Sequence, residues 1–481
     1  MLRNESIETT PSAGSAPFAS YLREFWQAVG GNPESLARVT VTGRGSLPSA
    51  FAVTEFATAA IGAASLALTE LVSATSGGVQ SVEVDRRLAS FWFGTTLRAD
   101  GWTLPPQWDA VAGDYLAADG WIRLHTNAPH HRDAALAVLG TAAERDAVAR
   151  AVSQWSADAL EAAVVGRNGC AAAMHSVAQW NDSPQGRAVG SEPLLHHALS
   201  PRTAMPAGRV SRERPLQGTR VLDLTRILAG PVATRFLAGF GADVLRIDPY
   251  GWEEPGTVPE VVLGKRCARL NLKDPVDRAT LERLLGEADV LVHGYRADAL
   301  GRLGLDAERR RELNPALVDV SLDAYGWSGP WRERRGFDSL IQMSTGIAEA
   351  GMQAMHSDRP VPLPNQAIDH ATGYLLAAAA IRGLTERLAT GAGCLARASL
   401  ARTAKLLIAH SRLQEPVATL TPECLGDLAP SIEQTAWGPA RRIKPPMFID
   451  GTPMFWEHPA SALGSSDARW QGHCQVDGKQ E

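Results

Sequence analysis

The sequence predicts an α/β protein with a Rossmann-like parallel sheet and a second, smaller mixed α/β unit. After residue 214, short apolar runs alternate with segments of helical periodicity, as they do in the βαβ units of parallel sheets. The chain has 481 residues, more than one compact core usually supports. Hydrophobic residues make up 45% of the chain and charged residues 21%, an ordinary composition for a globular protein.

Strands and helices are expected to alternate through this second half. The first expected strand is Val221–Leu224. Pro231 in the turn after it suits the start of a helix that runs to Gly239, because the N–H that proline lacks would be unpaired there anyway. The next expected elements are a strand at Val244–Ile247, a helix at Pro275–Glu287, a strand at Val290–His293, a helix at Asp306–Leu313 and a strand at Leu317–Leu322. This order predicts parallel strands joined by helical crossovers.

Changes in composition divide the chain into five expected segments. Residues 1–17 are rich in Ser, Thr, Pro and Ala and are expected to be a disordered tail. Residues 18–200 form a first half, with the smaller mixed unit between positions 100 and 200. Residues 201–214 contain Pro, Gly and Arg without an apolar period and are expected to be a linker. Residues 215–404 form the Rossmann-like unit, and residues 405–481 are a C-terminal extension.

Charge and cysteine usage exclude several classes of protein. The formal net charge of −5 argues against a nucleic-acid binder, which needs a basic surface. The five cysteines are far apart and no pair has CxxC spacing, so neither a disulfide framework nor a metal site is expected. The polar N-terminus lacks the apolar core of a signal peptide, and the alanine-rich runs are too short to span a bilayer. We therefore expect a cytoplasmic protein without a membrane partner.

Two alanine-rich segments resemble each other. They are AVTEFATAAIGAASLALTELVSATSGG in the first half and AIDHATGYLLAAAAIRGLTERLATGAG in the second. Glu55 falls opposite Asp369 in this alignment. Farther on, Thr75 falls opposite Thr390, so the spacing drifts by one residue. The similarity predicts an internal duplication.

Residues 215–404 resemble family III CoA-transferases, the CaiB/BaiF family. The matching blocks are PLQGTRVLDLTRILAGPVATRFLAGFGADVLRID, GKRCARLNLKDP, ADVLVHGYRADALGRLGL, LNPALVDVSLDAYGWSGPWRERRGFDSLIQMSTG and QAIDHATGYL, in the family's order and at its spacing. The first half resembles later parts of the same family. Residues 50–90 resemble the catalytic-helix segment, and GDYLAADGWIRLHTNAPHHRDAALAVLG resembles the start of the small domain. The resemblance implies a tandem or rearranged member whose N-terminal half supplies the small domain in cis.

The resemblance implies a CoA-transferase that moves CoA between an acyl-CoA thioester and a carboxylic acid through an aspartyl-CoA intermediate. Asp369 matches the catalytic carboxylate. It precedes an apolar helix, and the N-terminus of a helix favours an ionised, nucleophilic carboxylate. The alternative is that Asp369 only caps this helix. The family implies no permanently bound cofactor, CoA thioesters and acids as substrates, and a homodimer, although an internal tandem could act as a pseudo-dimer.

The matching blocks also indicate where CoA binds. Its phosphates favour nearby cations, and backbone groups can hold its pantetheine arm. The residues implied to contact CoA are Ile227, Leu228, Ala229, Lys265, Arg266, Tyr295, Arg296 and Arg302. Each arginine could equally be a solvated surface charge. Glu55, the counterpart of Asp369, is interpreted as a surface or capping residue.

Two other functions stay open at this stage. A CoA-ester racemase of the α-methylacyl-CoA type shares this fold and would use Asp369 as an acid or base paired with a histidine. A non-catalytic CoA-ester-binding subunit would account for the rearranged order and for the absence of a glycine run after Asp369. His370 could assist proton transfer or only pack. The pairs His130–His131 and His196–His197 lack a third ligand at metal spacing.

Overall fold

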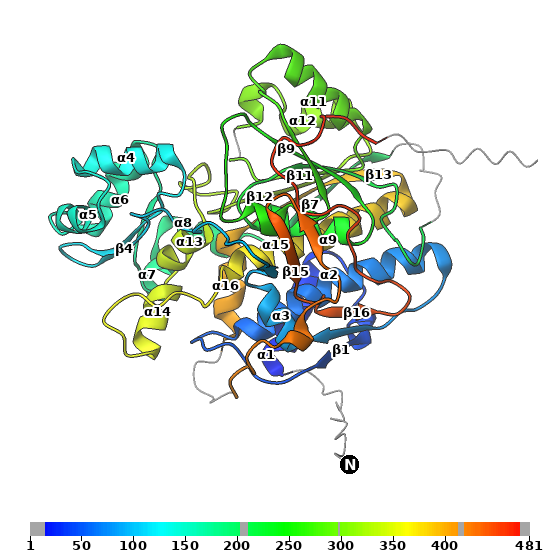
Figure 1. Ribbon diagram of the computed structural model, residues 1–481, viewed down its shortest axis with the longest axis horizontal. Coiled ribbons are helices and arrows are strands. Elements are labelled where there is room, and N and C mark those ends of the chain that lie inside the picture. Colours follow the sequence, from blue (N-terminus) through cyan, green and yellow to red (C-terminus); the bar gives the residue numbers. More distant parts are fainter. Residues whose placement is uncertain (1–14, 203–209, 297–298, 412–417, 472–481) are drawn as a thin grey trace, which may run out of the picture.

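The computed structural model describes residues 15–202, 210–296, 299–411 and 418–471 (Figure 1). Most of the expected tail and half of the expected linker therefore lie outside the described residues. The last two residues assigned to the tail, Ala16 and Pro17, instead open helix α1 (Ala16–Ala28), where proline is tolerated in the first turn. Arg202, assigned to the linker, ends strand β7 (His196–Arg202).

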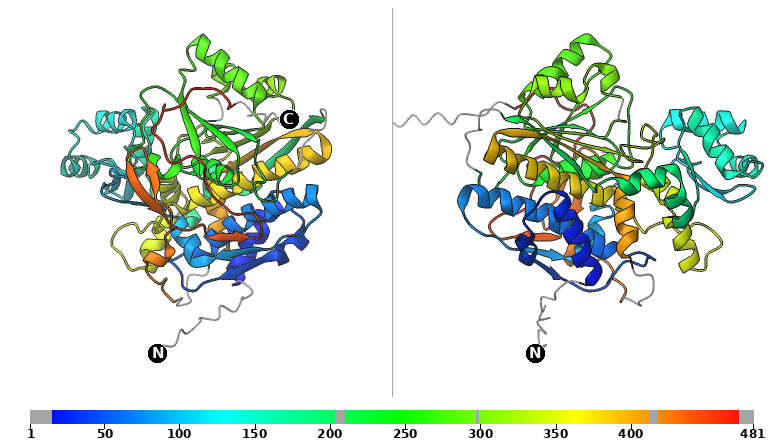
Figure 2. Two further views of the ribbon diagram at one scale, coloured as in Figure 1. Left: turned by 45° about the vertical axis from the view of Figure 1, so that its right-hand side comes forward. Right: turned by 180° about the vertical axis from the view of Figure 1, so that it is seen from behind.

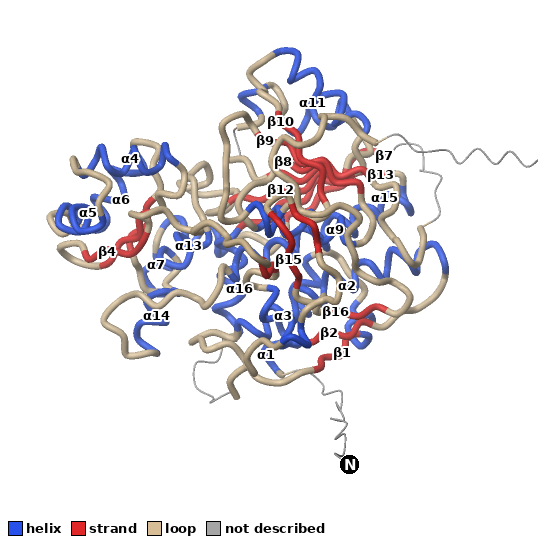
Figure 3. Tube along the Cα trace, viewed as in Figure 1, coloured by secondary structure: helices blue, strands red, loops and turns tan. Residues whose placement is uncertain are grey.

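A seven-stranded sheet forms the centre of the protein, in the order β10-β9-β8-β11-β12-β13-β7 (Figure 3). Its other strands are β8 (Arg220–Leu224), β9 (Asp243–Asp248), β10 (Lys265–Arg269), β11 (Val290–His293), β12 (Val318–Asp323) and β13 (Ala392–Ser399). All neighbours are parallel except β7, which pairs antiparallel with β13 at one edge. The expected parallel α/β sheet is confirmed. The strand order reverses direction between β8 and β11, which is where ligands bind in open α/β sheets.

Helices cover both faces of this sheet because successive side chains of a strand point to opposite faces. Leu222 and Leu291 pack with α11 (Pro275–Glu287) on one face. Val221 and Val290 belong to the core on the other face. The helices there are α9 (Ala229–Gly239) and α15 (Ala367–Thr390), and Figure 2 shows α15 between the sheet and helix α2 (Val53–Ser76). Helix α12 (Ala307–Leu313) lies where a helix was expected, with Asp306 as its N-cap residue.

Helices α2 and α15, which carry the two similar alanine-rich segments, pack against each other. Each has 24 residues and ends at a glycine in the left-handed region, Gly77 with φ 69° and Gly391 with φ 74°. Thr390 therefore lies opposite Ser76, so the one-residue drift expected from the sequence is wrong. Among the described residues, Val53–Thr75 of α2 alone has the length and hydropathy of a membrane span, but 89% of its apolar window is buried inside the protein, as in a core helix.

The elements around these two helices have the same order. Helix α2 lies between the parallel strands β1 (Val39–Thr42) and β2 (Val82–Asp85) and is followed by α3 (Arg86–Trp92). Helix α15 also lies between parallel strands, β12 and β13, and is followed by α16 (Leu400–His410), although α13 and α14 come between β12 and α15 along the chain. The similarity therefore extends from the helices to a strand–helix–strand–helix unit.

A smaller mixed unit lies to one side of the large sheet (Figure 1). Its antiparallel strands and its helices surround a separate hydrophobic core. These elements are β4 (Gly113–Leu116), β5 (Trp121–Leu124), β6 (Ala171–Ala173), α4 (Pro129–Leu139), α5 (Arg145–Val152) and α6 (Ala157–Gly166). Arg334 joins this unit to the rest of the chain by donating to Glu161 and to the Ala171 carbonyl, at 2.8 Å each.

The C-terminal residues fold back onto the first half. Strand β16 (Met447–Ile449) pairs with β2, and β15 (Gly438–Arg442) pairs with β3 (Leu97–Ala99). The remaining elements are η1 (Pro33–Arg38), α7 (Val177–Asp182), α8 (Pro184–Ser191), α10 (Val258–Val261), η2 (Gly301–Leu303), α13 (Asp338–Ser344), α14 (Ile347–Ala354), η3 (Leu425–Asp427) and β14 (Glu433–Thr435).

Gly373 allows α15 to approach α9 closely. A Cβ atom at this position would lie 2.5 Å from the carbonyl oxygen of Ala229 and 2.9 Å from the side chain of Val232. We expect Gly373→Ala to lower the free energy of unfolding by about 1–3 kcal/mol, because backbone atoms cannot yield to the added methyl group. Thermal or denaturant unfolding measures this difference.

Gly286→Ala is the matched control for this prediction. A Cβ atom there meets only the Leu313 carbonyl oxygen, at 3.8 Å, which is an ordinary contact. Alanine should therefore raise stability by up to about 1 kcal/mol through its helix propensity. Equal stability of Gly373→Ala and the wild type would contradict the close contact between α15 and α9.

Candidate active site

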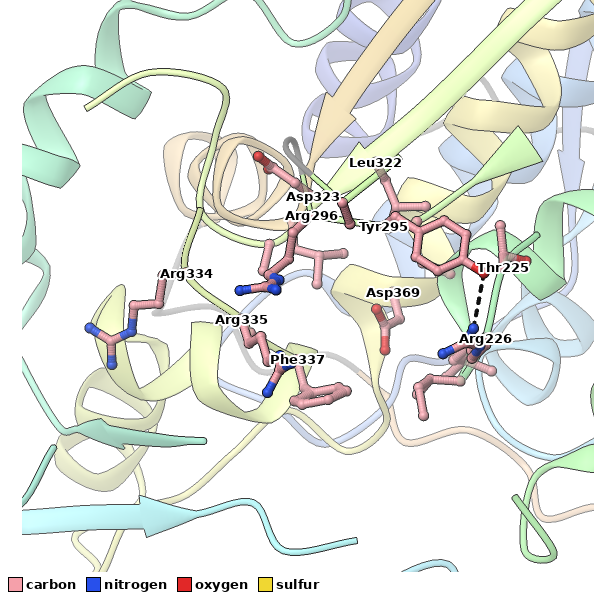
Figure 4. Close-up of a pocket in the computed structure, with 18 of the residues that line it drawn as sticks. Thr225, Arg226, Tyr295, Arg296, Leu322, Asp323, Arg334, Arg335, Phe337 and Asp369 are labelled. Carbon is pink, nitrogen blue, oxygen red and sulfur yellow. Dashed lines mark hydrogen bonds between the residues drawn. The ribbon is translucent and has the colours of Figure 1, made fainter. Parts of the chain in front are cut away.

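A cavity of about 480 Å³ opens at the carboxyl ends of the central strands (Figure 4). The loops that follow β8, β11 and β12 form one side of it, at the point where the strand order reverses. Side chains from the smaller unit and from the segment before α13 form the other side. Six residues expected from the sequence line this cavity: Asp369, Ile227, Leu228, Ala229, Tyr295 and Arg296.

Asp369 is the third residue of α15 and is only 6% exposed. The residue at the N-cap position, Gln366, makes no capping hydrogen bond with its side chain. Instead, the backbone N–H of Asp369 donates to Oδ2 of Asp338 at 2.8 Å. Asp338 from α13 therefore satisfies the first turn of α15, and the Asp369 carboxylate is left to face the cavity.

Asp338 is fixed by a chain of hydrogen bonds. Gln342, one turn along α13, donates to Asp338 Oδ1 at 2.5 Å. The amide oxygen of Gln342 accepts from the backbone N–H of Leu363 at 2.7 Å. This network links α13, the segment before α15 and the first turn of α15. Asp338 was not among the expected site residues, although it lies in the matching block that contains RRGFDSL.

Burial controls the protonation of this carboxyl pair. Burial and then the neighbouring Asp338 raise the pKa of Asp369 well above its usual value. Burial raises the pKa of Asp338 to about 6, against the opposing effect of hydrogen bonds from Gln342 and the Asp369 backbone. The helix N-terminus was expected to keep Asp369 ionised, but the net shift of its pKa is upward, toward the protonated form. Desolvation and a like charge outweigh the helix dipole.

The loop after β8 has a strained backbone. Ile227 adopts φ 67°, in the left-handed region that β-branched residues rarely enter. Its N–H donates to Glu254 Oε1 at 3.0 Å, and the indole N–H of Trp252 donates to the same oxygen at 2.6 Å. Glu254 thus holds the loop and Trp252, both of which line the cavity.

Arg226 lies between two aromatic rings of the cavity wall. Its guanidinium carbon is 4.8 Å from the centroid of Trp252 and 5.2 Å from that of Tyr295. It also donates to the Tyr295 hydroxyl at 2.9 Å (Figure 4). Such stacking is favourable for the flat, charged guanidinium. The sequence analysis missed Arg226, although it directly precedes the three loop residues expected to contact CoA.

Two further guanidinium groups lie on the other side of Asp369. Figure 4 shows Asp369 between Arg226 on one side and Arg296 and Arg335 on the other. Arg335 donates to the carbonyl of Asn168 in the smaller unit at 2.8 Å. Burial and the neighbouring charge of Arg296 lower the pKa of Arg335. No acidic side chain among the described residues pairs with Arg296 or Arg335, so this side of the cavity suits an anionic ligand.

Three expected CoA contacts do not line the cavity. Lys265 is buried, and its Nζ donates to Asp223 Oδ2 and to the Pro231 carbonyl, at 3.0 Å each. Arg266 pairs with Asp243 at 2.8 Å. Arg302 is exposed on η2. Lys265 and Arg266 lie on strand β10, at the sheet edge beyond β9, whereas the cavity is at the ends of the central strands.

The two other carboxylate and imidazole candidates also lie outside the cavity. Glu55, the counterpart of Asp369 in α2, pairs with Arg86 and accepts from Ser46. His370 is buried and stacks on Phe93 with ring centroids 5.2 Å apart. Consecutive side chains on a helix diverge, which explains why His370 points away from Asp369.

Two histidines of the smaller unit reach the cavity. His130 and His131, in the first turn of α4, line it together with Phe337. The sequence analysis considered this pair only for metal binding. The pair is brought to Asp369 by tertiary packing, since more than 230 residues separate them along the chain.

Known proteins share much of this sequence. Residues 216–467 match the family model described as CoA-transferase family III. The acyl-CoA transferase of Gibberella moniliformis is 28% identical over 331 residues, which cover 61% of this chain and 58% of that protein. The succinyl-CoA:glutarate CoA-transferase of Mus musculus is 30% identical over 251 residues, which cover 50% of this chain and 54% of that protein. The chain thus spans little more than half the length of these relatives.

Solved structures also show a partial match. The crystal structure of Rv3272 from Mycobacterium tuberculosis has a TM-score of 0.38 and 31% identity, over 41% of this chain and 57% of that one. The family match has the greater weight, because residues 216–467 are more than half of the chain and include the cavity loops and Asp369. The chain belongs to CoA-transferase family III.

Proposed function

We propose that this protein transfers CoA between an acyl-CoA thioester and a carboxylic acid, with Asp369 as the nucleophile. One observation carries the proposal: a buried carboxylate without a cationic partner among the described residues faces a cavity at the switch point of the sheet. The relatives are named as transferases of the same kind, including a succinate–glutarate CoA-transferase from Agrobacterium fabrum. They support the reaction class, while the acid that this chain uses is proposed below from its cavity.

The proposed reaction exchanges one thioester for another. An oxygen of ionised Asp369 attacks the thioester carbonyl, the C–S bond breaks, and CoA thiolate leaves an acyl–aspartyl anhydride. The thiolate attacks the aspartyl carbonyl and expels the first carboxylate, which leaves an aspartyl-CoA thioester. The acceptor carboxylate then attacks this thioester and breaks its C–S bond, which gives an aspartyl–acceptor anhydride and CoA thiolate. The thiolate attacks the acceptor carbonyl of this anhydride, forms the new acyl-CoA and expels the Asp369 carboxylate. No net proton is consumed, and burial of Asp369 limits hydrolysis of the anhydrides.

The cavity walls divide the binding work in this proposal. The loop Ile227–Ala229 offers backbone groups to the pantetheine arm, and Tyr295, after the end of β11, lies on the same side of Asp369 as Arg226, whereas Arg296 lies on the side of Arg335. Asp338 fixes the first turn of α15 and so positions Asp369. The arginines that line the cavity favour the binding of an anionic acid. The relatives named for glutarate are consistent with a dicarboxylic acid as the acceptor.

We also propose that one chain contains one complete site, with the smaller unit supplied in cis. The smaller unit contributes His130 and His131 to the cavity. Its Asn168 carbonyl accepts a hydrogen bond from Arg335. The counterpart position in α2 does not form a second site in this proposal, because Glu55 is paired with Arg86. The homodimer implied by the family is therefore not needed to complete this cavity.

A covalent intermediate on Asp369 is the first prediction. The protein is incubated with a panel of acyl-CoAs that includes succinyl-CoA, trapped with hydroxylamine or borohydride, and mapped by mass spectrometry. We expect an adduct on Asp369 that is absent from Asp369→Ala. If no adduct forms but α-protons exchange in deuterated water, the reaction is of the racemase kind. If neither occurs and CoA esters only raise the melting temperature, the protein is a binding subunit.

The number of sites per chain is the second prediction. Quantified trapping should reach one adduct per chain, and Glu55→Gln should leave the adduct yield within about twofold of wild type, since Glu55 is remote from the cavity. A yield of two adducts per chain, or an adduct on Glu55, would show that the first half is also a working site.

The pH dependence of the first half-reaction is the third prediction. Because its raised pKa keeps Asp369 protonated beyond the usual carboxyl range, kcat/KM for the acyl-CoA should rise with pH through that higher range. Asp338→Asn removes the neighbouring negative charge, so the pKa of Asp369 falls and the acid limb should move down by about one pH unit. Asp358→Asn, at an exposed position, should leave the profile unchanged. If the acid limb of Asp338→Asn is identical to that of the wild type, the pKa of Asp369 does not depend on the charge of Asp338.

A further inference from the structure

His131 is a buried imidazole that the proposed mechanism does not use. It lies in the first turn of α4 and is 3% exposed. It lines the same cavity as Asp369. Neither of its ring nitrogens has a hydrogen-bond partner within the described residues. A buried polar group without a partner costs stability, so such a group at a ligand cavity points to a ligand that completes it.

Ring packing, not hydrogen bonding, holds His131 in place. Its ring centroid lies 5.8 Å from that of Phe337 and 4.1 Å from that of His130. Phe337 is also stacked on His125, with ring centroids 3.8 Å apart. Phe337 directly precedes Asp338, which fixes the first turn of α15. The imidazole is thus held against the segment that positions Asp369, while both of its buried nitrogens lack a hydrogen-bond partner within the described residues.

The charge around His131 indicates what that ligand is. Burial, His130 and Arg335 lower the pKa of His131 to about 3, so the ring is neutral at pH 7 and offers one N–H donor and one acceptor nitrogen. Arg335 adds a guanidinium that, among the residues that the structure describes, donates to the Asn168 carbonyl and has no acidic partner. A neutral donor beside a guanidinium without an acidic partner suits a carboxylate.

The position of His131 indicates which substrate it meets. The loop Ile227–Ala229 and Tyr295 come from the strand ends and belong to the wall proposed for CoA. His131 and Arg335 belong to the other side of the cavity, which the smaller unit completes. A thioester that reaches Asp369 along the first wall leaves the second wall to the acid.

We propose that His131, together with Arg335, binds the carboxylate of the acid that takes CoA from the aspartyl thioester, and that His131 thereby sets the affinity for this second substrate. The assignment rests on the proposed function, of which it describes the second half-reaction. In that step His131 donates its N–H to a carboxylate oxygen of the acid, and no bond is made or broken at the ring.

The two half-reactions can be measured separately in the full-length protein. His131→Phe keeps a ring against Phe337 and removes both nitrogens, whereas His131→Gln keeps a donor and an acceptor. Charging of Asp369 by the acyl-CoA that gives the highest adduct yield is followed as the mass of the intact chain. Discharge is followed after adding each of a series of carboxylic acids that includes glutarate. Melting temperatures establish that each variant is folded.

We expect charging by His131→Phe within about twofold of wild type and a rise in KM for the acid of about 10- to 100-fold, as for loss of a buried hydrogen bond to a charged group. His131→Gln should recover part of the affinity. His197→Phe, the same exchange at an exposed position on β7, should change neither step. If His131→Phe folds poorly, His131→Gln and the acid dependence of its discharge decide the question.

Three outcomes would overturn the assignment. They are an unchanged KM for the acid in both variants, an equal loss of charging and discharge, and a loss of charging alone. The first would mean that only water occupies the nitrogens of His131, and the others that the residue serves CoA or packing. A wild-type protein that never forms an adduct on Asp369 would instead overturn the proposed function itself, which separates the two failures.

Discussion

The close packing of α15 between α9 and α2 is the constraint on which the site depends. Gly373 leaves room for the Ala229 carbonyl on one side of the helix, four residues after Asp369. On the other side, α15 packs against the second alanine-rich helix, α2. A helix buried on all sides needs small residues where neighbouring backbones approach, and both repeat segments have this composition. The same contact brings the loop after β8 to the first turn of α15, so the packing that fixes the helix also assembles the cavity.

Charge distinguishes the two repeat helices. Glu55 and Asp369 occupy the same position in helices of the same length, but Glu55 has an arginine partner and Asp369 faces another carboxyl. Burying a carboxyl beside a like charge is unfavourable and raises its pKa, whereas an ion pair removes that cost. The ionised form of Asp369 is therefore not stabilised by its surroundings in the folded protein. A reactive group of this kind is typical of a functional site, and the paired Glu55 is typical of a structural one.

The order of the chain also follows from this packing. The first half contains α2 and the smaller unit, and the C-terminal strands β15 and β16 return to pair with β3 and β2. Segments from both ends of the chain thus support the central sheet. One side of the cavity is built by the parallel strands and the other by the smaller unit, so neither half of the chain contains the whole cavity.

Local signals explain what the sequence by itself determined. The helix Pro275–Glu287 and the strand Val290–His293 were predicted with their observed bounds, because a proline start, apolar period and polar boundaries are written in neighbouring residues. The parallel sheet was predicted from the alternation of strands and helices, whereas Asp369 and the loop Ile227–Ala229 were implied by the blocks that resemble the family. Lys265 was expected to contact CoA but lies outside the cavity. The local sequence does not reveal that Asp223, two strands away in the sheet, pairs with it.

Only the tertiary structure decided which side chains meet at Asp369. Asp338, Arg335 and His131 come from a second helix, a loop and the smaller unit, and each acquires its role through contacts that no local spacing encodes. Protonation is decided at the same level. The helix N-terminus, visible in the sequence, favours ionised Asp369, but burial and the approach of Asp338 reverse that preference. Desolvation depends on every neighbour that excludes water, so it is a property of the folded chain and not of any segment of it.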